Sequence, residues 1–136
     1  MNERASKRES HEKRGGVDPL QAAIVSERAR RNLVKNLHNI RNVEDWVAKA
    51  AGCSKSWLAK CTKVYNGLTP NAILREERYK KIEAVILDNP EATASYVAGQ
   101  VAPHWSERNV CNFLRSYHDT NFKNLRRDLL NSEFNS

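Results

Sequence analysis

Two stretches of this sequence place cationic and amide side chains at helical spacing. The first stretch offers Lys55, Ser56, Ala59, Lys60 and Lys63. The second offers Ser106, Glu107, Arg108, Asn109, Asn112 and Arg115. Lys and Arg neutralise phosphates, whereas Arg and Asn can each pair with two atoms on the edge of a guanine or an adenine. The chemistry that these side chains indicate is recognition of a polyanion that carries bases.

The overall charge points to the same class of partner. The chain has 136 residues, of which 23 are Lys or Arg and 16 are Asp or Glu, so its formal net charge is +7. Such an excess of positive charge favours a polyanionic partner, because phosphates attract Lys and Arg and release their counterions on binding. No apolar run approaches the ~18 residues that a membrane span needs, and no signal-peptide core follows Met1. We expect a cytoplasmic protein that has no membrane partner.

The elements that would position these side chains are helices. Asp18-Pro19 and Thr69-Pro70 each place a capping residue before a proline, which is typical of a helix start. The apolar spacing predicts helices over about 19–38, 43–51, 54–65, 71–88, 93–101, 106–117 and 122–130. No strand-like alternation occurs over a useful length. The prediction is an all-α fold of about seven helices: a disordered polar arm (1–17), a first subdomain (18–70), a linker helix (71–89), a second subdomain (90–131) and a tail (132–136).

The first subdomain contains the pattern of a helix-turn-helix. We expect Ala48 to lie where the two helices touch, Gly52 to adopt the left-handed conformation of the turn and Ser54 to cap the second helix. The residues expected to be buried around the turn and behind the second helix are Cys53, Leu58 and Cys61. The alternative interpretation is an ordinary helical hairpin with a basic, solvated face.

The pattern is repeated after the long helix. Val97-Ala98 is again an apolar and small pair, and Ser106 begins a helix that would bury Val110 and Leu114. Both helices with cationic and amide side chains are followed by similar segments, Gly67–Ile73 and Asp119–Leu125. The repetition favours two helix-turn-helix subdomains over a chance hairpin.

Over about Leu33 to Leu130 the sequence resembles the AraC/XylS family of bacterial transcription regulators. The matching positions are Val47, Ala48, Gly52, Ser54, Leu58, the segment Gly67 to Pro70, Arg78, Tyr79, Ile82, Val85 and Ile86. The positions that depart from the family pattern are Thr62, Ala102-Pro103, Asp119 and Phe122. The first subdomain therefore matches the family more closely than the second.

The resemblance implies a transcription regulator that places two recognition helices in successive major grooves of double-stranded DNA. By matched position, Ser56, Ala59, Lys60, Arg108 and Asn112 would face base edges. The residues expected to hold phosphates are Lys55, Lys63 and Arg115. The chain has no room for a separate effector-sensing domain, so no obligatory small-molecule ligand is expected, and RNA polymerase is a candidate second partner.

The competing interpretation is a helical protein-interaction adaptor whose second unit no longer reads bases, since Glu107 would repel phosphate. An enzyme is not expected, because no paired carboxylates, nucleophile–base pattern or phosphate-binding loop stands out. No cofactor is implied either. The one arrangement that could favour a metal is the seven-residue spacing of His104, Cys111 and His118, which we interpret instead as a thiol and solvated imidazoles.

Three tryptophans and the basic residues of the first helix are further candidates for contact with nucleic acid. We expect Trp46 in the core, and Trp57 and Trp105 packed against neighbouring helices rather than stacked on bases. The cations of the first helix region are Arg28, Arg30, Arg31, Lys35 and Arg41. We expect these to form a solvated face.

Overall fold

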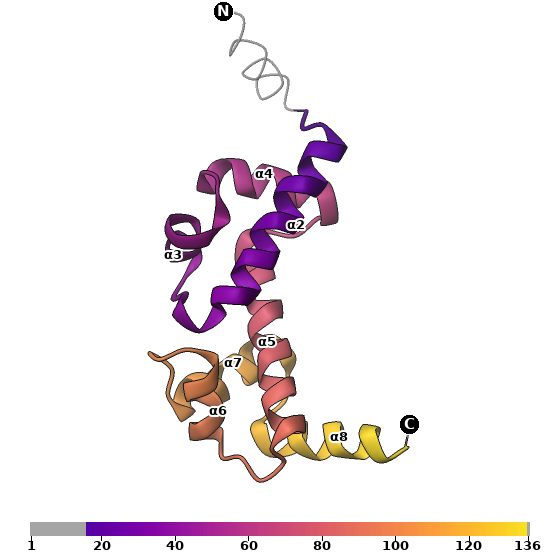
Figure 1. Ribbon diagram of the computed structural model, residues 1–136. Helices are drawn as coiled ribbons and strands as arrows, with labels where there is room; N and C mark the ends of the chain where they lie inside the picture. Colours follow the sequence, from indigo (N-terminus) through magenta and orange to yellow (C-terminus); the bar gives the residue numbers. More distant parts are fainter. Residues whose placement is uncertain (1–15, 136) are drawn as a thin grey trace, which may run out of the picture. The chain divides into compact units, whose positions relative to one another are not determined.

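The computed structural model describes the backbone of residues 16–135 and the side chains of residues 16–132, and all of its regular structure is helical (Figure 1). The α-helices are α2 (Pro19–Asn36), α3 (Val43–Trp46), α4 (Lys55–Asn66), α5 (Pro70–Asp88), α6 (Ala94–Val101), α7 (Glu107–His118) and α8 (Phe122–Asn135). A 3-10 turn, η1 (Leu37–Asn39), follows α2, and a π-helical turn, η2 (Val47–Ala51), follows α3. The described part of the chain contains no strand, and the predicted all-α fold of about seven helices is confirmed.

The helices begin where capping side chains satisfy their first backbone N–H groups. Asn42 Oδ1 accepts from the backbone N of Asp45 at 2.8 Å, and Thr93 Oγ1 accepts from the backbone N of Tyr96 at 3.1 Å. Pro19 and Pro70 are the first residues of α2 and α5, where the missing N–H of proline costs no hydrogen bond. These local signals place the helix starts within a residue or so of the predicted ones.

The contacts divide the chain into two units. Among the described residues, unit 1 contains 16–35 and Asn42–Leu74, and unit 2 contains Asn36–Arg41 and 75–135. The boundary falls within α5: its first turn belongs to unit 1, and the rest of the helix belongs to unit 2. The helix predicted as a separate linker is thus divided between the two units.

Unit 1 is built from α2, α3, η2, α4 and the start of α5. Trp46 is fully buried, and its indole Nε1 donates to the backbone O of Ala29 at 3.1 Å, which attaches α3 to α2. A smaller cluster joins Val17, Ala22 and Cys61. Val17 therefore belongs to the core of unit 1, although the sequence pattern assigned it to the polar arm. Residues 1–15 of the predicted arm lie outside the described residues.

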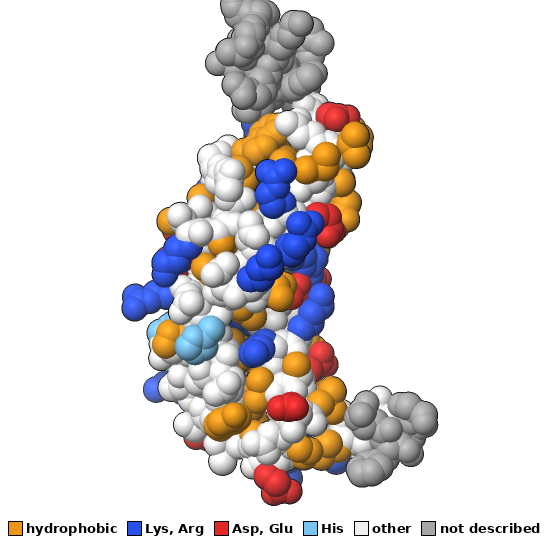
Figure 2. All heavy atoms as spheres, viewed as in Figure 1, with side chains coloured by type: hydrophobic (Ala, Val, Ile, Leu, Met, Phe, Trp, Pro, Cys, Tyr) orange, Lys and Arg blue, Asp and Glu red, His pale blue; other side chains and the backbone are white. Residues whose placement is uncertain are grey.

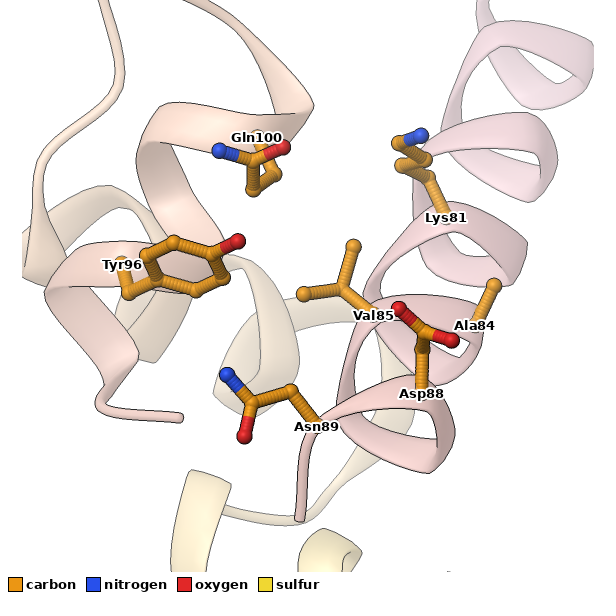
Figure 3. A pocket seen from close by; sticks show the side chains of 7 residues that line it. All are labelled: Lys81, Ala84, Val85, Asp88, Asn89, Tyr96 and Gln100. Carbon is orange, nitrogen blue, oxygen red and sulfur yellow. The ribbon is translucent and has the colours of Figure 1, made fainter. Parts of the chain in front are cut away.

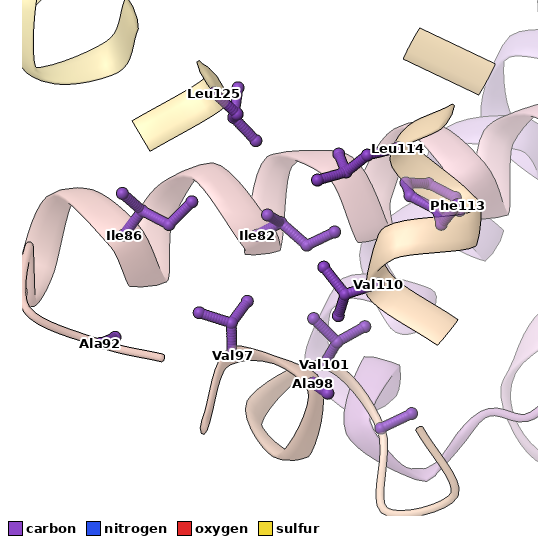
Figure 4. Packing of buried hydrophobic residues seen from close by; sticks show 11 residues of the cluster. Ile82, Ile86, Ala92, Val97, Ala98, Val101, Val110, Phe113, Leu114 and Leu125 are labelled. Carbon is purple, nitrogen blue, oxygen red and sulfur yellow. The ribbon is translucent and has the colours of Figure 1, made fainter. Parts of the chain in front are cut away.

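Unit 2 has one hydrophobic core, formed by four helices. Ile82 and Ile86 project from α5 toward α6, α7 and α8 (Figure 4). The buried residues that surround them are Ala92, Val97, Ala98, Val101, Ala102, Val110, Phe113, Leu114 and Leu125. Helix α8 continues to Asn135, beyond the predicted end near Leu130, so residues 132–135 of the predicted tail are helical.

Segment 36–41 is held in unit 2 by side chains that hydrogen-bond to the backbone of the segment. Arg78 Nη2 donates to the carbonyl oxygens of Ile40 at 2.9 Å and Arg41 at 2.8 Å, and the guanidinium lies 5.1 Å from the ring centroid of Trp105. His38 Nε2 lies 2.9 Å from the carbonyl oxygen of Gly99. A buried arginine therefore links α5 to segment 36–41 within unit 2.

Of the helices in the described part of the chain, none combines the length and the apolar composition that crossing a lipid bilayer requires.

Candidate nucleic-acid interface

The turn between η2 and α4 has the conformation that the sequence predicts. Gly52 adopts the left-handed region with φ of 77°, and Ser54 caps α4 by accepting from the backbone N of Trp57 at 3.2 Å. Cys53 is half-buried in the turn, and this burial raises the pKa of its thiol, partly offset by the charge of Arg28. The predicted left-handed conformation of Gly52 and the predicted cap at Ser54 are confirmed, whereas Cys53 is less buried than predicted.

Ala48 does not have the predicted role, because its side chain is exposed. The buried alanine of this segment is Ala51, which is 3% exposed. The reason is the π-helical turn at Val47–Ala51: a π-helix bonds i to i+5, so the wider turn brings Ala51, five residues after buried Trp46, to the inner face. The close helix contact predicted at Ala48 is therefore wrong.

Helix α4 buries one face and exposes the other. Leu58, Cys61 and Thr62 are buried, as predicted for the first two, and Thr62 Oγ1 is satisfied by the carbonyl oxygen of Ala59 at 3.3 Å. The predicted interface residues lie on the other side: Lys55, Ser56, Lys60 and Lys63 are exposed and Ala59 is half-buried. The structure thus brings all five to a surface that a large partner can reach.

Acidic neighbours reduce the positive charge at the start of α4. Lys55 forms an ion pair with Glu44, and this lysine lowers the pKa of the Glu44 carboxyl chiefly by hydrogen bonding to it. Beside it, Lys49 and Asp45 form a second ion pair at 3.3 Å. The charge of Lys55 is therefore partly neutralised, whereas Lys60 and Lys63 are exposed cations farther along the same helix.

Helix α7 is the corresponding element of unit 2. Val110, Phe113 and Leu114 are buried on its inner face; the first and last were predicted, whereas Phe113 was missed. The predicted site residues of α7 are all exposed. An open depression of about 600 Å³ runs along this face, and the residues that line it are Ser106, Glu107, Arg108, Cys111, Asn112 and Arg115.

Asn109 caps the start of α7, a structural role that was not predicted from the sequence. Its Oδ1 accepts from the backbone N of Ser106 at 2.7 Å and from Ser106 Oγ at 3.0 Å, which caps the start of α7. Pairing with an adenine edge requires the same oxygen as an acceptor, so Asn109 is not placed to form that pair. The spacing Ser-x-x-Asn, which resembles a capping box, was the signal that could have revealed this role.

The two helices share one register, in which equivalent positions are 52 residues apart. Ser54 and Ser106 begin them, and the buried triad of α4 (58, 61, 62) corresponds to that of α7 (110, 113, 114). Gly67 and Asp119, both with positive φ, end them. Thr69 and Asn121 then cap α5 and α8 by accepting from backbone N–H groups three residues ahead.

A surface pocket and the metal-ligating side chains are the other candidates for a functional site. A pocket of about 340 Å³ opens between α5 and α6, where Lys81, Tyr96 and Gln100 border the same space (Figure 3). These three side chains are exposed, so the pocket is an open surface depression. No three His, Cys, Asp or Glu side chains in the described part of the chain meet in a group that could hold a metal ion.

Two of the tryptophans pack within the units, whereas most of the cations of α2 are exposed. Trp57 packs beside Val17 and Ala22, and Trp105 packs against Phe113 with ring centroids 5.4 Å apart, so both are half-buried, as expected. In unit 1, Lys and Arg side chains gather along α2 (Figure 2). The exposed cations of that helix are Arg28, Arg31 and Lys35.

No family model, curated protein or solved structure matches the chain.

Proposed function

We propose that this chain is a sequence-specific double-stranded DNA-binding transcription regulator in which α4 and α7 are the recognition helices. The observation that carries the proposal is the shared register of these helices. Each follows a helix and a turn, begins after a serine at the N-cap position, buries the same three positions and exposes polar or basic side chains on the opposite face. An exposed helix of this kind fits the major groove, which admits an α-helix and displays the base edges.

The charge of the two faces supports a nucleic acid over other partners. Lys63 on α4 and Arg108 and Arg115 on α7 are exposed cations, and the chain as a whole carries a formal charge of +7. A protein adaptor would be expected to present an apolar patch at the centre of its interface. The predicted site positions on α4 and α7 instead carry charged, amide and hydroxyl groups, except for the methyl group of Ala59. The large apolar side chains that these two helices also expose are Val64, Tyr65 and Tyr117.

In this proposal the two helices read successive major grooves on one face of the duplex. Successive grooves are separated by about one helical turn of DNA, ~34 Å. Hydroxyl-radical footprinting on a selected fragment should therefore show two protected windows whose centres are about 10 base pairs apart. A single protected window would exclude the simultaneous use of both helices.

The direct test is binding of the full chain to labelled random-sequence duplex DNA at increasing salt. Release of counterions makes the logarithm of the binding constant fall linearly with the logarithm of salt concentration, with a slope of about −0.9 per phosphate contact. We expect a slope of roughly −3 or steeper, because several cations should meet phosphates. No binding at low salt, or a nearly flat salt dependence, would refute the proposal.

Matched charge reversals locate the interface. Lys63→Glu and Arg115→Glu place a negative charge on α4 and α7, and both should weaken binding and reduce the salt slope. Lys81→Glu is the control, since it makes the same change in charge at an exposed position beside the α5–α6 pocket. If Lys81→Glu weakened binding as much as the other two, the assignment of α4 and α7 would be wrong.

A further inference from the structure

The shared register of α4 and α7 allows the two exposed faces to be compared position by position. Ser56 corresponds to Arg108, Ala59 to Cys111, Lys60 to Asn112 and Lys63 to Arg115, each pair being 52 residues apart. The buried triads fix this alignment independently of the exposed residues, so the differences between the faces are differences in what each helix presents to a partner.

The face of α4 carries side chains that select bases poorly. Ala59 offers only a methyl group, and the Ser56 hydroxyl both donates and accepts, so it suits several bases. The ammonium groups of Lys60 and Lys63 are compact point charges on flexible stems, which fit a phosphate without fixing a planar geometry. This helix is equipped to hold the DNA backbone.

The face of α7 carries two planar groups at its centre. Arg108 and Asn112 are both exposed, and they lie one helical turn apart on the stripe that lines the open depression. A guanidinium can pair with O6 and N7 of guanine, and an amide can pair with N6 and N7 of adenine. Four residues of α-helix rise ~6 Å, which corresponds to about two base-pair steps of 3.4 Å.

We infer that the two units have different roles in DNA recognition. Helix α7 of unit 2 reads a guanine and an adenine within about two base-pair steps of each other, through Arg108 and Asn112. Helix α4 of unit 1 contributes affinity through the phosphates without selecting sequence. The inference rests on the proposed function and names the bases that the proposed site takes.

The test is selection of bound fragments from a random duplex library, using the full chain and two double variants. Arg108→Ser with Asn112→Lys gives α7 the residues that α4 has at the matched positions. Ser56→Ala with Lys63→Ala removes polar groups from α4. All four positions are exposed, so thermal unfolding should be unchanged in both variants and serves as the check on folding.

The wild type should enrich one short motif containing the guanine and the adenine. In the α7 variant the ratio of affinity for the selected motif to affinity for random DNA should fall by about 10-fold or more, because each side chain that pairs with a base edge through two hydrogen bonds contributes roughly that much discrimination. Random DNA should still bind, since the new lysine retains a cation. The α4 variant should lose affinity for selected and random DNA by the same factor.

Two results would overturn the division of labour while leaving DNA binding intact. One is loss of the preference in the α4 variant together with its survival in the α7 variant. The other is a wild type that binds DNA but enriches no motif. Absence of DNA binding by the wild type would instead refute the proposed function itself, so the two failures can be told apart.

Discussion

The rings of Tyr79 on α5 and His118 at the end of α7 are stacked, with centroids 3.6 Å apart and planes inclined by 12°. Phe113 lies against the same imidazole with a centroid distance of 5.4 Å. Burial, with a smaller contribution from the charge of Arg75, lowers the pKa of His118. The stack thus holds α7 against α5 through an imidazole whose neutral form is favoured by burial.

This arrangement predicts a loss of stability in mild acid. Because the pKa of His118 is lower in the folded state, the unfolded chain binds more protons once the pH falls below the ordinary imidazole value of about 6.5. The contribution of His118 is therefore fully present above that pH and is lost as the pH falls through the folded-state pKa. Urea unfolding should give a smaller free energy of unfolding at acid pH than at neutral pH.

The control for this prediction is His118→Phe, which retains an aromatic ring against Tyr79 and cannot be protonated. Every other ionisable group is common to both proteins, so the difference between their pH profiles belongs to His118. The profile of His118→Phe should be flatter between neutral and mildly acidic pH. Parallel profiles would show that protonation of His118 does not affect the fold.

Arg78 should be among the most sensitive positions for stability. Its Nη2 satisfies two backbone carbonyls of segment 36–41, and removing a charged donor from such groups leaves them without their partner. We expect Arg78→Met to lower the free energy of unfolding by roughly 2–4 kcal/mol, and Arg78→Lys to recover only part of this, because an ammonium lacks the planar fork. Urea denaturation provides the measurement.

The matched control for Arg78 is Arg115→Met, the same change at an exposed position. It should alter the free energy of unfolding by less than about 0.5 kcal/mol while weakening DNA binding under the proposed function. Equal stability of Arg78→Met and Arg115→Met would contradict the role given to Arg78.

Most of the helices were predictable because their signals are local. The capping pairs before Pro19 and Pro70, the turn at Gly52 and the apolar spacing of Leu58 and Cys61 act within a few residues of each other. The exposed faces of α4 and α7 follow from the same spacing, since the buried positions leave the others to solvent. This is why the exposure of the candidate interface residues could be predicted from the sequence.

The features that the sequence did not reveal depend on interactions that local spacing does not encode. The π-helical turn shifted the buried alanine from Ala48 to Ala51, and no residue type marks such a turn. The partners of Arg78 lie 37 and 38 residues away along the chain. The capping role of Asn109 was missed because the same amide that can cap a helix can also pair with an adenine edge.

The change of register at the π turn leads to a prediction about overpacking. Ala51→Leu should lower the free energy of unfolding by roughly 1–3 kcal/mol, because Ala51 is 3% exposed and a larger side chain there would overpack the core. Ala48→Leu makes the same change on the exposed side and should cost less than about 0.5 kcal/mol. Thermal or urea unfolding of the pair provides the comparison. A larger decrease in the free energy of unfolding for Ala48→Leu than for Ala51→Leu would support the helix contact that the sequence predicted at Ala48.

The ends of α4 and α7 offer a matched test of backbone strain. Gly67 has φ of 74° and no atom within 4 Å of the position that a Cβ would take, so Gly67→Ala should cost about 1–2 kcal/mol through the left-handed conformation alone. At the equivalent position, Asp119 adopts φ of 49° with a side chain present, and Asp119→Gly should raise the free energy of unfolding by up to about 1 kcal/mol. Urea unfolding of both variants should therefore give shifts of opposite sign. If Asp119→Gly destabilised the protein, the aspartate side chain would have to stabilise the end of α7 by more than the strain that its backbone imposes.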